Sequence, residues 1–319
     1  MPGTHKMKNL ELKNSSYEYL EKAFAEWLDI LGYCPMSAYN MPSAVREFLH
    51  FLETNNINQI KALKQQHYKV YFNHISSRGN QRRGGGLSNN YLNKHIQALE
   101  KFYEFLNHKG VQNLPPVILK QLKLDKEEVT VLSTEEIQQL YKATEKESSN
   151  PKQQAFNARD RAMLAIFYGC GLRRNEGVNL HVSDINFDTR VVHVRKGKNY
   201  QERLVPFSRT GLHYLQEWVY DYRPILVKSK REGNLFISYR GTPMRGNALY
   251  KRLKLLQLEI GGPVLQSKEI GLHTLRHSIA THLLQNGMEL QKIQRFLGHR
   301  SLESTQIYTH LIEKEDGQF

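Results

Sequence analysis

The feature that most constrains the fold is the polar stretch from Lys123 to Glu128, which follows two consecutive prolines, Pro115 and Pro116. Proline interrupts a helix, and a polar segment without apolar periodicity adds nothing to a hydrophobic core. The chain has 319 residues, which is enough for two domains with separate cores. We therefore predict an N-terminal basic arm at 1–13, a helical domain at 14–122, a linker at 123–131 and a second domain at 132–319.

The first domain is predicted to be helical, and its clearest helix runs from Ser88 to Asn107, with Ser88 as N-cap and Gly110 just past the end. Apolar residues at helical spacing are expected to face a core; they are Leu92, Ile96, Leu99, Tyr103 and Leu106. The opposite face carries Asn90, Lys94, Gln97 and Lys101. Such a polar stripe is most often a solvated face, but in a basic protein it also suits the phosphates and base edges of DNA.

The glycine-rich loop before this helix carries Arg78, Arg82 and Arg83. These arginines either follow a phosphate backbone or are simply solvated. The sequence leaves both interpretations open.

The second domain is predicted to contain a buried helix and a small antiparallel sheet. Residues 161–172 are apolar almost all round, and Gly169 and Gly171 allow a tight exit from that helix. Two short strands are expected at 191–195 and 202–206, joined by a hairpin turn at 196–201, with a further strand-like segment at 235–237. The expected fold class is mainly α with a small antiparallel β-sheet.

Charge favours nucleic acid as the partner. Lysine plus arginine number 45 against 31 acidic residues, a formal net charge of +14, and a field of this sign attracts a polyanion. No apolar run approaches the ~18 residues of a membrane span and no signal peptide is evident, so we expect a cytoplasmic, DNA-associated protein without membrane contact. Cys34 and Cys170 are far apart and are expected to be free, buried thiols.

The last fifty residues carry the most specific chemistry. His273 and Arg276 stand three apart at a helix start, so they share one face, and His299 and Tyr308 follow in the order His–Tyr. Arginine offers a fork of donors that fits phosphate oxygens, and tyrosine can act as a covalent nucleophile. This set predicts attack on a phosphodiester by a tyrosine.

Earlier segments add to that set. Arg173 follows the buried helix, and Glu176 lies three residues on, where its carboxylate can orient a guanidinium. Lys198 lies on the hairpin turn, where its ammonium can reach a leaving oxygen. His273 and His277 have the spacing of a zinc-binding helix, but the glutamate of the HExxH motif is absent, so no metal is expected.

The chain resembles the tyrosine recombinases, also called the phage integrase family, over nearly its whole length. The segments GLRRNE, GKNYQERLVP, HTLRHSIATHLL and LGHRSLESTQIYTH are similar to the family's successive catalytic motifs. The segment LSNNYLNKHIQALEKFYEFL is similar to the last helix of its N-terminal DNA-binding domain. The resemblance implies a SAM-like helical DNA-binding domain followed by an α/β catalytic domain.

The resemblance also implies a role for each residue of the candidate site. Arg173 and Arg276 would clamp the scissile phosphate, and Lys198 would be the general acid for the departing 5′-oxygen. His273 and His299 would hydrogen-bond the phosphate, with His273 also a candidate base. Tyr308 would form a 3′-phosphotyrosine, and Glu176 would support the site without touching DNA.

Two departures from the family pattern bear on this site. Gly177 stands where the family has an aliphatic residue, which predicts looser helix packing there. Lys196 lies close enough to Lys198 to be an alternative general acid.

The resemblance further implies a site-specific recombinase without cofactor, metal or ATP. Its partner would be double-stranded DNA with a recombination site, bound by a homotetramer on two sites that forms from monomers or weaker oligomers, with an accessory DNA-bending protein as an optional partner. Leu311 and Ile312 of the tail are candidate anchors on a neighbouring subunit. A type IB topoisomerase and a non-catalytic DNA-binding regulator are the alternatives. Dimer resolution, integration or excision of a mobile element, and inversion remain equally open.

Overall fold

The computed structural model describes residues 10–80, 84–124, 129–195, 202–229 and 232–298. Six of the predicted site or alternative residues lie outside the described residues: Arg82, Arg83, Lys196, Lys198, His299 and Tyr308. Leu311 and Ile312 lie outside them as well. The contacts divide the chain into two compact units, Met1–Glu127 and Glu128–Phe319, and each is described by itself.

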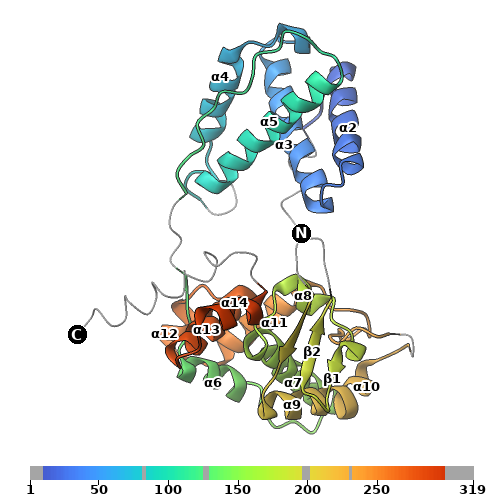
Figure 1. The fold of residues 1–319 in the computed structure, drawn as a ribbon, viewed down its shortest axis with the longest axis vertical. Helices are drawn as coiled ribbons and strands as arrows, with labels where there is room; N and C mark the ends of the chain where they lie inside the picture. Colours follow the sequence, from blue (N-terminus) through green and yellow to red (C-terminus); the bar gives the residue numbers. More distant parts are fainter. Residues whose placement is uncertain (1–9, 81–83, 125–128, 196–201, 230–231, 299–319) are drawn as a thin grey trace, which may run out of the picture. The chain divides into compact units, whose positions relative to one another are not determined.

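The first unit is helical (Figure 1). Its elements are α2 (Ser15–Ile30), α3 (Pro35–Thr54), η1 (Ile60–Ala62), α4 (Gln65–Ser77) and α5 (Asn89–His108). The Asn14 side chain caps α2 by accepting from the backbone N–H groups of Ser16 and Tyr17. Helix α3 packs against α2 and α5, and the core between them is rich in aromatic side chains such as Phe24, Phe48 and Phe102.

Helix α5 confirms the amphipathic pattern of the sequence. Ser88 is its N-cap and accepts from the backbone N–H of Tyr91. Leu92, Ile96, Leu99 and Leu106 are buried and Tyr103 is half-buried. The chain beyond α5 returns alongside it: Asn93 donates to the carbonyl of Leu122 at 2.8 Å and accepts from the Leu122 N–H at 2.7 Å.

The second unit is mainly α with a small sheet, as the sequence predicts (Figure 1). Its elements are α6 (Thr134–Lys142), α7 (Pro151–Leu164), η2 (Ala165–Gly169), α8 (Arg174–Val178), η3 (Val182–Asp184), β1 (Ile185–Asn186), β2 (Val191–Val194), β3 (Arg203–Pro206), α9 (Arg209–Gln216), η4 (Glu217–Tyr222), α10 (Arg223–Leu226), α11 (Gly246–Glu259), α12 (Pro263–Ser267), α13 (Leu272–Gln285) and α14 (Leu290–Leu297).

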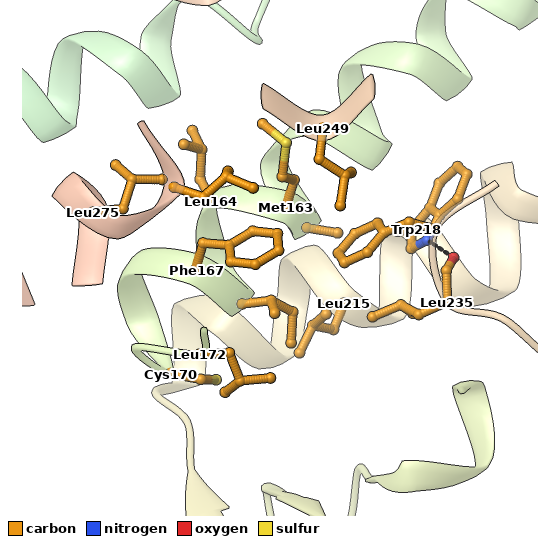
Figure 2. Packing of buried hydrophobic residues seen from close by; sticks show 14 of the residues in the cluster. Met163, Leu164, Phe167, Cys170, Leu172, Leu215, Trp218, Leu235, Leu249 and Leu275 are labelled. Atoms are coloured by element: carbon orange, nitrogen blue, oxygen red, sulfur yellow. Dashed lines mark hydrogen bonds between the residues drawn. The ribbon is translucent and has the colours of Figure 1, made fainter. Parts of the chain in front are cut away.

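The predicted buried helix begins earlier than the apolar pattern does. Asn150 caps α7 and Pro151 occupies its first turn, so the helix includes a more polar start. After Leu164 the helix widens into the π-helical turn η2 and leaves through Gly171, whose φ of +59° suits glycine. Figure 2 shows the core around these elements, where Trp218 Nε1 donates to the carbonyl of Leu235 at 3.0 Å.

The sheet has the order β1-β2-β3 and is antiparallel, with Val192 opposite Val205 in the β2–β3 pair. The hairpin prediction is therefore confirmed for its strands, and β1 was missed. The predicted strand at 235–237 is wrong, since Asn234 and Ile237 make only isolated bridges. The Leu235 N–H bond to the Leu180 carbonyl belongs to the bridge between His181 and Asn234, whereas the Phe236 carbonyl accepts from Met244 beside the bridge between Ile237 and Pro243. The segment therefore changes partner after one residue pair, and no ladder extends along it.

Gly177 does not loosen the packing of α8, contrary to the prediction. A Cβ atom at this position would lie 2.5 Å from Cζ of Phe167, so the ring occupies the space that an aliphatic side chain would need. Phe167 is fully buried and stacks on Phe236 with ring centroids 6.2 Å apart. The glycine thus permits an aromatic contact in place of the family's aliphatic one.

Both cysteines are free, but only Cys170 is buried, and Cys34 is half-buried. Burial raises the pKa of the Cys170 thiol to about 12, which leaves it protonated and unreactive at neutral pH. The helices of the described residues include none with the length and apolar character needed to cross a membrane.

Candidate active site

The centre of the candidate site is Glu176, which α8 places under Arg173. Arg173 is the N-cap residue of α8, and its backbone N–H donates to Glu176 Oε2 at 2.8 Å. The Arg173 guanidinium also donates through Nη1 to Glu176 Oε1 at 3.0 Å. A capping interaction of the local sequence therefore sets the carboxylate beside the first predicted phosphate ligand.

Two further guanidinium groups meet the same carboxylate. Arg203 on β3 binds it in a fork, with Nη1 to Oε1 at 3.0 Å and Nη2 to Oε2 at 2.9 Å. Arg276 on α13 has Nη1 4.0 Å from Oε2. The Glu176 side chain is only 1% exposed. Three guanidinium groups around one buried carboxylate leave an excess of positive charge, which suits an anion such as phosphate.

The pKa of Glu176 is lowered by this arrangement. Burial is the largest single influence and would raise the pKa, but the hydrogen bonds and charge of Arg203, together with the N–H and charge of Arg173, outweigh it. The carboxylate is therefore ionised at neutral pH and can hold the guanidinium groups in place.

The C-terminal end of α14 supplies a second set of partners for the same arginines. Arg203 Nε donates to the carbonyl of Phe296 at 3.0 Å, and Arg276 Nη2 donates to that of Leu297 at 2.7 Å. Arg173 donates to the carbonyls of Leu297 at 3.4 Å and Gly298 at 3.0 Å. Carbonyl groups at a helix end have no partners within the helix and carry partial negative charge, so they bind cations well.

Among the described residues that are predicted to bind the phosphate, Arg276 is the most deeply buried. It is 3% exposed, and its Nη1 donates to the carbonyl of Gly171 at 2.6 Å. This bond ties α13 to the exit of the buried helix. Gly171 has no room for a side chain, since a Cβ atom there would lie 2.8 Å from Leu297 Cδ2.

His273 lies one helical turn before Arg276 and is exposed. Although the residue is exposed, its imidazole is partly covered, and this desolvation is the largest influence that lowers the pKa; the charges of Arg276, Arg174 and Arg173 lower it further. The ring is therefore mainly neutral at neutral pH, the form in which an imidazole can accept a proton.

The other two histidines of α13, His277 and His282, have partners or surroundings that fit packing. His282 is buried and its Nδ1 lies 2.9 Å from the Tyr168 hydroxyl. Burial lowers the pKa of His277 to about 4, with His273 and Arg276 adding to the shift. Within the described parts of the chain, no group of three or more His, Cys, Asp or Glu side chains is arranged to hold a metal ion.

The predicted polar stripe of α5 is accessible, with one difference among its members. Asn90, Lys94 and Gln97 are exposed. Lys101 is half-buried, pairs with Glu104 at 2.5 Å and lies 5.9 Å from the ring centroid of Tyr33. Lys94 therefore offers a charge that is more available to a phosphate than that of Lys101.

Arg78 has a structural partner that the sequence did not reveal. Its guanidinium binds the buried carboxylate of Glu47, and His95 Nε2 lies 3.9 Å from the other oxygen of that carboxylate. Tyr71 completes this group through a hydroxyl 3.0 Å from His95 Nδ1. Arg78 thus fixes the end of α4 where the glycine-rich loop begins.

Arg203 is the site residue that sequence reasoning missed. A usable signal exists, because residues two apart on a strand share a face, and Arg203 stands two positions before the fully buried Val205. A charged side chain on a buried face needs an ionic partner. The pattern therefore indicates an ion pair at Arg203 but does not say with which acid.

Comparison with known proteins identifies the family once this geometry is established. The model of the phage integrase family matches residues 130–315, which is more than half of the chain. The chain belongs to the phage integrase family. Its enzyme class is that of a tyrosine-type site-specific DNA recombinase.

Relatives and solved structures agree with this membership. The chain is 36% identical to the tyrosine recombinase XerD of Oceanobacillus iheyensis over 71% of this chain and 73% of the relative. It is 30% identical to XerD of Staphylococcus epidermidis over 85% and 86% of the two chains. It also shares the fold of XerH bound to its difH substrate, with a TM-score of 0.72, 20% identity and coverage of 97% and 98%. The Tn1549 transposon integrase in complex with transposon right-end DNA has a TM-score of 0.68, 18% identity and coverage of 93% and 98%.

Proposed function

We propose that the chain cleaves and rejoins duplex DNA at a specific site through a covalent 3′-phosphotyrosine formed by Tyr308. The observation that carries this proposal is the group of Arg173, Arg203 and Arg276 around the buried carboxylate of Glu176. Two of these arginines are the ones that the family pattern assigns to the scissile phosphate. Their guanidinium groups contact the end of α14, and the chain continues from there through His299 to Tyr308.

The chemistry needs positive charge more than it needs a metal. Phosphoryl transfer depends mainly on positioning and on stabilising the negative charge that spreads over the phosphate oxygens. Arg173 and Arg276 supply that charge in a fixed geometry, and Glu176 holds them without neutralising both. We therefore propose a reaction that proceeds without metal or ATP, the energy of the broken bond being kept in the tyrosine ester.

Proton transfer is assigned to His273 and the hairpin lysine. A neutral His273 can accept the proton of the Tyr308 phenol, whose ordinary pKa of about 10 disfavours attack at neutral pH. Lys198 protonates the departing 5′-oxygen, and Lys196 is the alternative. His299 contributes a hydrogen bond to the phosphate.

The proposed assembly is a homotetramer on two DNA sites that exchanges strands in pairs through a four-way junction. The α5 residues Asn90, Lys94 and Gln97 contact the DNA, with Lys101 and the loop residues Arg78, Arg82 and Arg83 as further candidates. The tail at Leu311 and Ile312 docks on a neighbouring protomer. A substrate of cellular or mobile-element DNA places the enzyme in the cytoplasm, with a DNA-bending protein as an optional accessory.

The decisive experiment uses a nicked suicide duplex that traps the covalent intermediate on a denaturing gel. The wild-type chain should form a trapped band in the presence of EDTA, and Tyr308→Phe should bind the same DNA without forming one. A band that persists in Tyr308→Phe would refute the assignment of the nucleophile. Strict dependence of wild-type cleavage on an added metal would refute the metal-free reaction.

The two lysines are separated with a substrate that carries sulfur at the 5′-bridging position. A thiolate leaves without a proton, so this substrate should restore cleavage by Lys198→Ala, whereas Lys196→Ala should need no restoration. The reverse pattern would move the general acid to Lys196. Relaxation of supercoiled plasmid without a specific site would favour a type IB topoisomerase, and specific binding without any covalent adduct would favour a regulator.

A further inference from the structure

We propose that Arg203 is a positioning residue for recombination, which aligns Arg173, Arg276 and the end of α14 without touching DNA itself. This inference rests on the proposed function. It gives a role to Arg203, a residue of the segment GKNYQERLVP to which the family resemblance assigned none.

The first ground is that the Arg203 guanidinium is already engaged by protein groups. Nη1 and Nη2 bind the two oxygens of Glu176, and Nε binds the carbonyl of Phe296. The side chain is 8% exposed. Glu176 and the end of α14 thus hold the Arg203 guanidinium in place, and a group held in this way can act on the reaction by fixing the position of those partners.

The second ground is that Glu176 is shared. Oε1 accepts from Nη1 of both Arg203 and Arg173, each at 3.0 Å, and Oε2 accepts from Arg203 and from the Arg173 N–H. Arg276 lies 4.0 Å from the same Oε2. The fork of Arg203 therefore fixes the plane of the carboxylate that both phosphate ligands contact. Without it, the buried carboxylate can rotate and draw Arg173 and Arg276 towards itself.

The third ground is the contact with the end of α14. A Cβ atom at Gly298 would lie 2.8 Å from Arg203 Nη1 and 3.0 Å from Cδ, so the guanidinium packs directly against the Gly298 backbone. Gly298 has a φ of +65° and is the residue before His299. Arg203 thus sets where the chain leaves α14 towards His299 and Tyr308.

The same residue joins these groups to the hairpin. Arg203 begins β3, and the turn at 196–201 that carries Lys198 directly precedes this part of the chain. Glu176 and Arg203 are 27 residues apart in the sequence, and Arg203 and Phe296 are 93 apart. One side chain therefore bridges three of the family's catalytic motifs.

The test measures single-turnover cleavage and DNA affinity separately for Arg203→Ala, Arg203→Lys and a matched control, Arg252→Ala. Arg252 also binds a buried carboxylate in the same unit, since its Nε and Nη2 donate to Asp160 at 2.9 and 2.5 Å. Misplacement of reacting groups by about 1 Å can cost about 10²-fold in rate. Arg203→Ala should lose about that factor in cleavage with DNA affinity unchanged, and Arg203→Lys, which keeps the charge but not the fork, should fall in between.

A substrate with a methylphosphonate at the scissile position distinguishes positioning from damage to the fold. Methyl in place of one non-bridging oxygen removes the phosphate charge, so alignment of Arg173 and Arg276 matters less. The ratio of wild-type to Arg203→Ala cleavage rates should therefore shrink on this substrate. An unchanged ratio, an equal loss in Arg252→Ala, or relief by 5′-bridging sulfur instead would overturn the proposal. A wild-type chain that forms no adduct would refute the proposed function, whereas wild-type activity with unimpaired Arg203→Ala would refute this inference alone.

Discussion

Replacing Gly177 by alanine tests how tightly α8, which carries Glu176, packs against the ring of Phe167. The new Cβ atom would lie 2.5 Å from Cζ and 2.6 Å from Cε1 of Phe167. Carbon atoms in contact are normally about 3.5–4.0 Å apart, so the overlap is about 1 Å. Phe167 is fully buried and stacked on Phe236, and Figure 2 shows it among core side chains on several sides. The ring must shift, or α8 must.

The expected loss of stability follows from two opposing contributions. Overpacking a well-filled core costs about 1–3 kcal/mol, whereas alanine is favoured over glycine in a helix by about 1 kcal/mol. The difference leaves a net loss in the free energy of unfolding of up to about 2 kcal/mol, and an overlap of about 1 Å with a fully buried ring places the expectation at the upper end of that range. Glu176 precedes Gly177, so a displaced α8 also moves the carboxylate that holds Arg173, and the cleavage rate should fall as well.

Urea denaturation followed by the fluorescence of Trp218, in a Trp27→Phe background, measures this loss in the second unit. Gly169→Ala is the matched control, because a Cβ atom there has no neighbour within 4 Å, and it should not destabilise. Phe167→Leu should make room for the new methyl, so the double mutant should show a favourable coupling of about 0.5–3 kcal/mol. If Gly177→Ala is as stable as the control, or if the two substitutions add independently, the reasoning from occupied space is wrong.

Three further predictions concern the first unit. Lys94→Ala should reduce the slope of log K for DNA binding against log salt concentration by about 0.9 per lost phosphate contact. Lys101→Ala should reduce this slope less, because the Lys101 ammonium is already paired with Glu104. Anisotropy titrations at several salt concentrations measure both slopes, and equal slopes in the two variants would show that the reasoning is wrong. Asn93→Ala removes two hydrogen bonds to the backbone of Leu122 and should lower the free energy of unfolding by about 1–3 kcal/mol. Thermal unfolding measures this loss, and an unchanged midpoint would contradict it. Burial lowers the pKa of His95 to about 4, so the unfolded chain takes up a proton on this residue before the folded chain does. The stability that His95 contributes is therefore complete above its ordinary pKa of about 6.5 and falls by up to about 3 kcal/mol as the pH drops towards 4. Urea midpoints read from the fluorescence of Trp27 should depend less on pH in His95→Gln, and an equal pH dependence would contradict the assignment.

The features that the sequence predicted correctly are local or carried by ordered motifs. The spacing of Leu92, Ile96 and Leu99 is sufficient to define the buried face of α5, because helical periodicity relates near neighbours. Alternation and turn residues likewise located β2 and β3. The order of the four catalytic segments was sufficient to indicate the family, since each segment carries its chemistry within a few residues.

The sequence failed where the outcome depends on distant parts of the chain. The segment at 235–237 has the composition of a strand, yet only isolated bridges form, from Asn234 to His181 and from Ile237 to Pro243. Gly177 was expected to leave a gap, yet Phe167 from another helix fills it. Neither outcome is encoded near the residue concerned, so no local pattern could reveal it.

The candidate site also has a part that the local sequence predicts and a part that depends on tertiary packing. The sequence by itself predicted Arg173, Glu176, His273 and Arg276 as candidates for one chemistry, because their types and spacing fit a phosphodiester reaction and the family pattern. Only the tertiary structure decided that Arg203 shares Glu176 with them and that the carbonyl groups at the end of α14 bind all three guanidiniums. The physical reason is that a buried charge must be matched by whichever opposite charge or dipole the fold brings within about 3 Å, and that partner is set by packing rather than by proximity along the chain.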